Sequence, residues 1–451
     1  MSGPRRYAWL CVLALGLVPS CAVESADGDA QSAPIPTGAA CNGSGRYRCF
    51  AHVQTDDDGR IRAEAQPADA PAGFSPTDLQ AAYDIPASIS GHPTIALIDA
   101  YGDTALESDL ATYRAAFNLP ECSIANGCLK IVNTDGNPSP LPGAPPGDDD
   151  WTVETSLDVD MASAACPSCN LVVIQAQDDQ GNGLELAQAT AASLGASVIS
   201  NSWGGPEKQG VSLDGVEPYF DQPVAVFVAA GDDGYDDGGR GPDYPGTSSH
   251  TIAVGGTHLE RASNARGWTE TAWSSGGSAC SLSIAKPSYQ ISTNCAFKAT
   301  TDIAAVGDPQ TGMASFNSND GGWTVVGGTS AATPLVAAIF AATGNGGQTS
   351  GAFIAQNADK LNDVTSGNNG DCGNVLCTAG KGWDGPTGYG TPDAKLFMTA
   401  SATPDGSGDD PYGQISGGCN AAGGDTSWLA IIAMLILAPA RAAAGRRRAR
   451  A

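Results

Sequence analysis

Short apolar runs alternate with helical stretches along the middle of the chain. The runs lack the polar alternation of a half-exposed strand, which is typical of strands buried on both faces. We expect strands over residues 94–98, 171–174, 196–199, 224–228 and 252–254. Helical periodicity or an Ala-rich composition predicts helices over residues 107–117, 151–161, 184–194, 330–343 and 351–361. Strands that alternate with helices predict an α/β fold with a mostly parallel central sheet covered by helices on both faces.

One predicted strand is followed closely by an aspartate. Asp232 ends the sequence Phe-Val-Ala-Ala-Gly-Asp, which begins inside the apolar run 224–228. Open α/β sheets carry their sites beyond the carboxyl ends of the strands. Aspartate is also a common turn former. Asp232 is therefore either a functional carboxyl group or a turn residue.

A serine stands at the start of the predicted Ala-rich helix. Gly327, Gly328 and Thr329 precede Ser330 directly. Glycine lets the backbone approach a substrate closely, and a helix N-terminus stabilises negative charge. Both properties suit a nucleophile. The alternative is that Ser330 only caps the helix.

Two carboxylates share one face of the predicted helix 151–161. Glu154 and Asp158 are four residues apart, which places them side by side on a helix. Carboxyl groups that lie close together share protons, and one of them can then act as a base of raised pKa. The same spacing is common on solvated helix faces, so it carries little weight alone.

Taken together, these motifs resemble those of the sedolisin family of serine-carboxyl peptidases. The Gly-Thr-Ser-x-x-x-Pro pattern that ends at Pro334 is similar to the nucleophile loop of sedolisins and subtilisins. The resemblance covers about residues 73–398 and extends to the segments 74–83, 99–103, 200–204, 244–245, 253–257 and 301–304. It implies a subtilisin-like fold and a serine-type peptidase, most often an endopeptidase, although removal of tripeptides also occurs in the family.

The resemblance implies a role for each of four residues. Ser330 would attack the scissile carbonyl, and Glu154 would take its proton and later pass it to the leaving amine. Asp158 would hydrogen-bond Glu154. A protonated Asp232 would donate to the oxyanion. Subtilisins use a histidine base instead, and none of the four histidines of this chain lies in a His-Gly-Thr helix start.

The resemblance also implies one structural calcium ion. The family holds calcium near the end of the domain, and two segments of this chain match its ligands. These would be the side chains of Asp363 and Asp384 and the backbone carbonyls of Val364, Gly380 and Gly382. An all-oxygen set suits a hard cation. The alternative is a Gly-rich turn with two surface aspartates.

Charge and cysteine content limit the partners and the compartment. The net charge is −26, so nucleic acid would be repelled, and the acidity suits either a solvated surface or acidic surroundings. An oxidising compartment would join neighbouring cysteines in five pairs: 41/49, 122/128, 166/169, 280/295 and 372/377. The rival for Cys166 and Cys169 is a zinc site, but no second CxxC or His pair completes one.

The ends of the chain indicate export. Arg5 and Arg6 precede an apolar run that is typical of a signal peptide, and Cys21 is a candidate for lipid attachment. The predicted organisation is a signal over 1–21, a leader or pro-segment over 22–72, a peptidase domain over 73–399, a Gly/Asp/Ser-rich linker with Cys419 over 400–427, and a short hydrophobic span with an Arg-rich tail over 428–451. This tail resembles a C-terminal sorting signal.

The sequence therefore predicts a peptidase that is secreted by a bacterium or held at its surface. It would be a monomer that meets membranes only through its terminal anchors, and it would hydrolyse protein or peptide substrates in acid. The first alternative is a catalytically silent relative that acts as a surface adhesin. The second is a glycosidase, since two carboxylates can also hydrolyse sugars.

Overall fold

The computed structural model describes residues 34–401, apart from residues 44, 65–70, 87, 88, 90 and 148. The predicted signal peptide, Cys419 and the hydrophobic span lie outside these residues. Within them, no helix is both long enough and apolar enough to cross a membrane.

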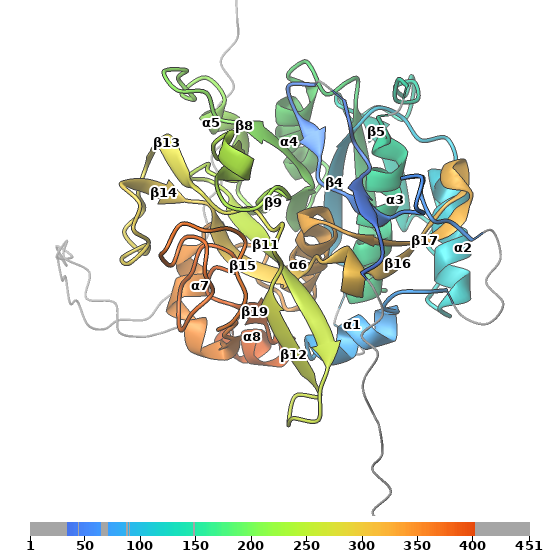
Figure 1. Cartoon of the computed structure of the whole chain (residues 1–451). Coiled ribbons are helices and arrows are strands. Elements are labelled where there is room, and N and C mark those ends of the chain that lie inside the picture. Colours follow the sequence, from blue (N-terminus) through green and yellow to red (C-terminus); the bar gives the residue numbers. More distant parts are fainter. Residues whose placement is uncertain are drawn as a thin grey trace, which may run out of the picture. The chain divides into compact units, whose positions relative to one another are not determined.

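An eight-stranded sheet forms the centre of the fold (Figure 1). Its order is β12 (Trp268–Ala272), β11 (Ile252–Arg261), β9 (Ala225–Ala229), β7 (Val198–Asn201), β4 (Thr94–Ala100), β6 (Asn170–Ala176) and β5 (Leu129–Asn133), with β15 (Thr301–Val306) also paired to β11. Every pair is parallel except β11 with β12. The mostly parallel sheet predicted from the apolar runs is confirmed.

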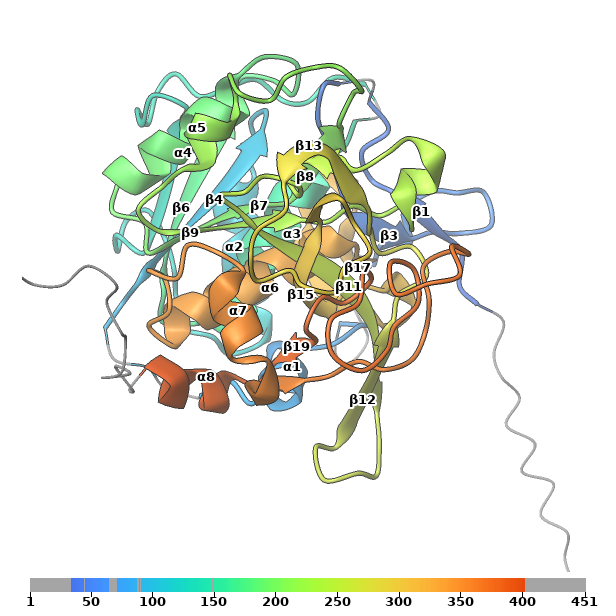
Figure 2. The same cartoon turned by 90° about the vertical axis from the view of Figure 1, so that its left-hand side faces the viewer.

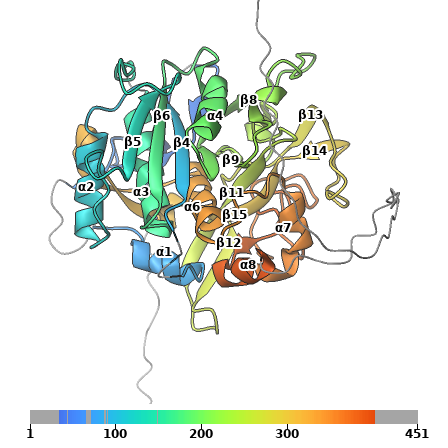
Figure 3. The ribbon, with the colours of Figure 1, turned by 180° about the vertical axis from the view of Figure 1, so that it is seen from behind.

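Helices cover both faces of this sheet, as predicted. They are α1 (Pro76–Ala82), α2 (Leu106–Ala116), α3 (Trp151–Ala165), α4 (Gly183–Ser193), α5 (Glu217–Phe220), α6 (Thr329–Ala342), α7 (Ala352–Gln356) and α8 (Ala394–Ser401). Figure 2 shows α4 and α5 on one side of the sheet and α6 on the other. Seen from behind, α2 and α1 lie next to α3, which both helices contact (Figure 3).

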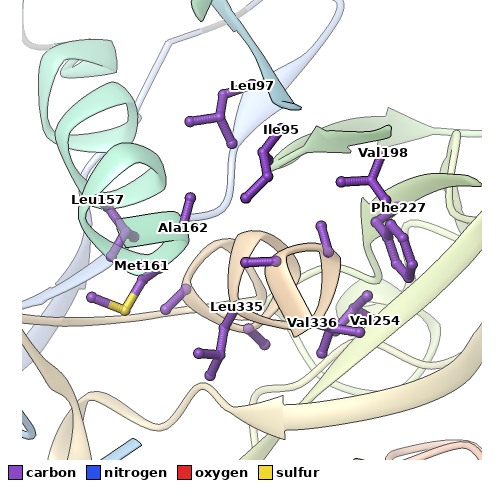
Figure 4. Packing of buried hydrophobic residues seen from close by; sticks show 14 of the residues in the cluster. Ile95, Leu97, Leu157, Met161, Ala162, Val198, Phe227, Val254, Leu335 and Val336 are labelled. Atoms are coloured by element: carbon purple, nitrogen blue, oxygen red, sulfur yellow. The ribbon is translucent and has the colours of Figure 1, made fainter. Parts of the chain in front are cut away.

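The core lies where α6 packs between α3 and the strands. Val336 of α6 lies next to Val254 of the sheet, whereas Leu335 points away from Phe227, and Met161 of α3 packs from the other side (Figure 4). These side chains are fully buried, and burial of each stabilises the fold by about 1.5–3 kcal/mol. Such packing holds the first turn of α6 at the carboxyl ends of the central strands.

Two predicted elements differ in length from those observed, and one observed strand was not predicted. The helix expected over 351–361 is wrong in length, because α7 ends at Gln356 and a short 3₁₀ turn, Ala358–Lys360, follows. Strand β11 continues to Arg261, where antiparallel pairing with β12 replaces parallel pairing with β9. Strand β5 was not expected, because its sequence Leu-Lys-Ile-Val-Asn mixes exposed and buried positions.

Smaller sheets join the N-terminal segment to the rest of the fold. One contains β1 (Thr37–Ala39), β3 (His52–Gln54), β17 (Gly322–Gly327) and β16 (Met313–Asn317). Another contains β10 (Asp243–Tyr244), β8 (Trp203–Pro206) and β2 (Arg48–Cys49). Residues within the predicted leader thus pair with strands of the predicted peptidase domain.

Two further sheets have two strands each. One pairs β13 (Cys280–Ala285) with β14 (Phe297–Ala299), and the other pairs β18 (Leu361–Asn362) with β19 (Thr391–Pro392).

All five predicted disulfides are present, each between neighbouring cysteines. Cys166 and Cys169 bond to one another, so the zinc interpretation of this pair is excluded.

Candidate active site

The start of α6 brings Ser330 to the carboxyl ends of the central strands. Gly328, and not Ser330, is the N-cap of this helix, so the interpretation of Ser330 as a simple cap is wrong. The backbone of Gly328 has a φ of 95°, in the left-handed region that glycine tolerates. A Cβ atom at this position would lie 2.6 Å from Oδ2 of Asp232, so glycine also leaves room for that carboxyl group.

The hydroxyl of Ser330 is hydrogen-bonded to a carboxylate. Its Oγ lies 2.8 Å from Oε2 of Glu154 and 3.0 Å from the carbonyl oxygen of Ser202. Ser330 and Glu154 are both fully buried. This geometry places a proton acceptor within direct reach of the hydroxyl, as a nucleophile requires.

Glu154 belongs to a cluster of three buried carboxyl groups. Burial, reinforced by the charges of Asp158 and Asp99, raises the pKa of Glu154 well above its usual value. Burial and Asp99 raise the pKa of Asp158 in the same way, and the Ser202 hydroxyl donates to Oδ1 of Asp158 at 2.6 Å. Three neighbouring carboxyl groups in an apolar interior cannot all be ionised, so they hold protons between them.

The sequence prediction did not include Asp99 in the site. It is the sixth residue of β4 and is fully buried, with neither carboxyl oxygen hydrogen-bonded within the described chain. The signal that could have revealed it is an aspartate inside an otherwise apolar strand. A charge is placed there only at considerable cost unless it is paired or protonated.

Asp232 presents one free oxygen beside the nucleophile. Its Oδ1 accepts from the backbone nitrogen of Thr329 at 2.8 Å and from the Thr329 hydroxyl at 2.7 Å. Its Oδ2 is buried and has no hydrogen-bond partner among the described residues. Burial raises the pKa of Asp232 well above its usual value, although the bonds from Thr329 oppose this shift. A proton on Oδ2 would turn this oxygen into a donor.

No histidine is hydrogen-bonded to Ser330 or Glu154, and all four histidines lie in the described part of the chain. The nearest to the site is His52, whose Nε2 lies 3.7 Å from Oδ2 of Asp232. Burial lowers the pKa of His52 to about 4. Glu154, and not a histidine, is therefore the candidate proton acceptor for Ser330.

An extended segment that was not predicted to lie here crosses the site. The backbone nitrogen of Phe50 lies 3.1 Å from Oγ of Ser330 and 3.1 Å from the carbonyl oxygen of Ser202. The backbone nitrogen of Ala51 donates to Oε2 of Glu154 at 2.9 Å. This segment is the reason that Ser330 and Glu154 are inaccessible to solvent.

The two predicted calcium-binding segments lie side by side. The backbone nitrogen of Gly382 donates to Oδ2 of Asp363 at 3.1 Å, and that of Gly380 donates to Oδ2 of Asp384 at 2.9 Å. Neither aspartate forms a salt bridge with a described basic residue. Burial chiefly, with a contribution from Asp363, raises the pKa of Asp384 to about 7.

In the described structure the carboxylate oxygens of both aspartates accept hydrogen bonds, from Gly380, Gly382 and Thr387. A hard metal ion would have to replace some of these donors, although two neighbouring carboxylates without a basic partner suit such an ion. Clusters of three or more His, Cys, Asp or Glu side chains that could hold a metal do not occur in the described residues, so backbone carbonyls would have to complete the ligand set.

The fold and the site define a class. The chain has a central parallel sheet, and a serine at the start of a buried helix is hydrogen-bonded to a carboxylate. These features are those of a serine-carboxyl variant of the subtilisin-like fold. The family model described as "Subtilase family" matches residues 148–358, which include all four candidate catalytic residues.

Comparison with individual proteins points to a narrower group within this class. Kumamolisin from Bacillus sp. (strain MN-32) is 31% identical over 369 residues, which is 74% of this chain and 64% of that protein. Sedolisin from Pseudomonas sp. (strain 101) is 29% identical over 379 residues, with coverage of 75% and 63%. A solved structure of Pseudomonas sedolisin, described as a serine-carboxyl proteinase, superposes with a TM-score of 0.60 at 26% identity over 74% of this chain and 99% of that one.

The chain is similar to sedolisins over about three quarters of its length. It spans just under two thirds of the length of these two curated relatives.

Proposed function

We propose that this chain is a secreted or cell-surface serine-carboxyl peptidase that hydrolyses protein or peptide substrates in acid. The observation that carries the proposal is the hydrogen bond of 2.8 Å between Oγ of Ser330 and Oε2 of Glu154, without a histidine in contact with either group. The similarity to kumamolisin and sedolisin supports the same reaction class.

The residues would act in the following order. Glu154 accepts the proton of Ser330 as Oγ attacks the scissile carbonyl carbon, and it returns the proton to the leaving amine. Asp158 is a positioning residue that keeps the shared protons of the cluster near Glu154. A protonated Asp232 donates from Oδ2 to the oxyanion, and the N-terminus of α6 adds its positive end.

We propose one calcium ion at Asp363 and Asp384, completed by the carbonyl groups of Val364, Gly380 and Gly382. The proximity of the two carboxyl groups, which is close enough for Asp363 to raise the pKa of Asp384, supports this site. When bound, the ion would tie the loop around Gly382 to residues 363–364 and would have no part in the chemistry.

The test is hydrolysis of a denatured protein by the purified chain after incubation in acid, with the product peptides identified by mass spectrometry. Ser330→Ala is expected to abolish the products. The matched control is Ser156→Ala, because Ser156 is also buried and its hydroxyl has no hydrogen-bond partner in the described structure. Equal activity of wild type and Ser330→Ala, or no hydrolysis at any acidic pH, would contradict the proposal and favour a silent adhesin.

A further inference from the structure

The segment across the active site pairs with other strands both before and after the catalytic groups, as a bound peptide strand would. On one side of the site, Arg48 and Cys49 pair antiparallel with Trp203 and Gly204 of β8. On the other side, β3 pairs antiparallel with β17, with His52 and Val53 opposite its last residues. Addition of an extended strand to exposed strand edges is a general way in which proteins bind peptides.

The peptide bond between these two pairings lies directly at the catalytic groups. Phe50 supplies the nitrogen that lies 3.1 Å from Oγ of Ser330, so the nucleophile lies beside the Phe50 carbonyl group. On the far side of this bond, the Ala51 nitrogen lies 2.9 Å from Oε2 of Glu154. Glu154, which would protonate the leaving amine, thus already contacts the amide nitrogen of this bond.

The carbonyl oxygen of Phe50 lies next to the free oxygen of Asp232. A Cβ atom built on Gly328 would lie 1.9 Å from the Phe50 oxygen and 2.6 Å from Oδ2 of Asp232. Both oxygens therefore border the same small space, and a proton on Asp232 would face the place where an oxyanion forms. Ser330, Glu154 and Asp232 thus surround the bond between Phe50 and Ala51.

We propose that residues 48–53 bind as a built-in substrate and that Ser330 cleaves the chain between Phe50 and Ala51. This inference rests on the proposed function. Oγ of Ser330 bonds to the Phe50 carbonyl carbon while the bond from that carbon to the Ala51 nitrogen breaks. Glu154 carries the serine proton to this nitrogen. One water molecule then hydrolyses the ester, which leaves a carboxylate on Phe50 and an amine on Ala51.

The described disulfide bonds do not tie the released piece to the cleft. Its disulfide, Cys41–Cys49, lies entirely before the cut. Among the residues that the structure describes, no disulfide joins residues 34–50 to the rest of the chain. The departure of this piece would remove the contact of Phe50 with Ser330 and would open the part of the site that precedes the cut.

Side-chain contacts of the same segment indicate what other substrates would fit. The ring of Phe50 packs on Gly204, where a Cβ atom would lie 2.8 Å from the ring carbon Cε2. Arg48 forms ion pairs with Asp233 at 2.6 Å and with Asp237 at 2.8 Å.

After release, those carboxylates would keep Arg240 as their described basic partner. Because Phe50 and Arg48 make these contacts, we expect the enzyme to prefer substrates with an aromatic residue directly before the cut and a basic residue two positions before that one.

The experiment follows the N-terminus of the full chain during incubation in acid. In wild type, N-terminal sequencing and intact mass are expected to show a new chain that begins at Ala51, formed with a half-life that a tenfold dilution leaves unchanged. Ser330→Ala should show no such chain. Phe50→Asp should slow the cut at least 100-fold, whereas the matched control Phe297→Asp should leave the rate unchanged, because Phe297 is a half-exposed residue of β14.

The outcomes separate this inference from the proposed function. If added peptides are hydrolysed while the Phe50–Ala51 bond stays intact, or if the chain is cut only elsewhere, the inference is wrong and the proposed function stands. If neither added peptides nor the chain is cut, both are wrong. If Phe50→Asp does not fold, the comparison of wild type with Ser330→Ala tests the cut instead. The preference is then tested with two peptides, one with Arg and one with Glu two positions before the phenylalanine. Cleavage of the Arg peptide should be at least tenfold faster, and equal rates would overturn the expected preference.

Discussion

Replacement of Asp99 by asparagine should change how the stability of the fold depends on pH. Asp99 is fully buried, and burial raises its pKa from 3.8 to about 7. Between these values the folded chain holds a proton that the unfolded chain has released. Stability is therefore highest below the pKa of the unfolded chain and falls as the pH rises towards 7. A shift of about three pH units, at 1.36 kcal/mol for each unit, gives a loss of about 4 kcal/mol.

Urea unfolding at pH 4, 5, 6 and 7 would measure this effect, with Ser330→Ala as the background so that no chain is cut. The free energy of unfolding should fall with rising pH, and Asp99→Asn should reduce the fall between pH 4 and pH 7 by about 4 kcal/mol. Asp214→Asn is the matched control, because Asp214 is exposed. Parallel curves for Asp99→Asn and its parent would refute the assignment of this proton to Asp99.

Three further predictions concern the site and the proposed metal. Alanine at Ser330, Glu154 or Asp232 should lower kcat/KM by at least about 10²-fold with an unchanged circular dichroism spectrum; near-normal turnover of any variant would remove that residue from the mechanism. Asp232→Asn should extend activity to higher pH, because an amide donates at any pH; an unchanged alkaline limit would contradict this. A chelator should lower the melting temperature and added calcium should restore it, because an ion bound only to the folded state stabilises it; no response to either would exclude a calcium site at Asp363 and Asp384.

The fold could be predicted from the sequence wherever a strand is buried on both faces. The apolar runs of β4, β6, β7 and β9 match observed strands because each lies inside a sheet covered by helices. Strand β5 mixes exposed and buried positions, so its pattern was less distinct. Helix α7 is shorter than predicted because the chain turns at Asn357, where the periodicity gives no stop signal.

The candidate catalytic residues were predicted because each stands in a recognisable local motif. Ser330, Glu154 and Asp232 come together from α6, α3 and the loop after β9, and the structure adds their hydrogen bonds. Asp99 lies in the segment 99–103 that carries part of the resemblance, but it was given no role, because only the packing of β4 against α3 brings it near Glu154. The covering segment was missed because strand pairing over a distance leaves no local signal, since its register depends on β8 and β17, more than a hundred residues away.

The central claim is that a carboxylate, and not a histidine, activates Ser330. The most direct test is the pH profile of kcat/KM on an uncharged peptide, measured on chain that has first been incubated in acid, with stability checked at each pH. Loss of the base on Glu154 should set the acidic limit, and loss of the proton on Asp232 should set the alkaline limit. The account predicts a maximum below pH 7. A maximum above pH 7 would contradict it and would point to a histidine base.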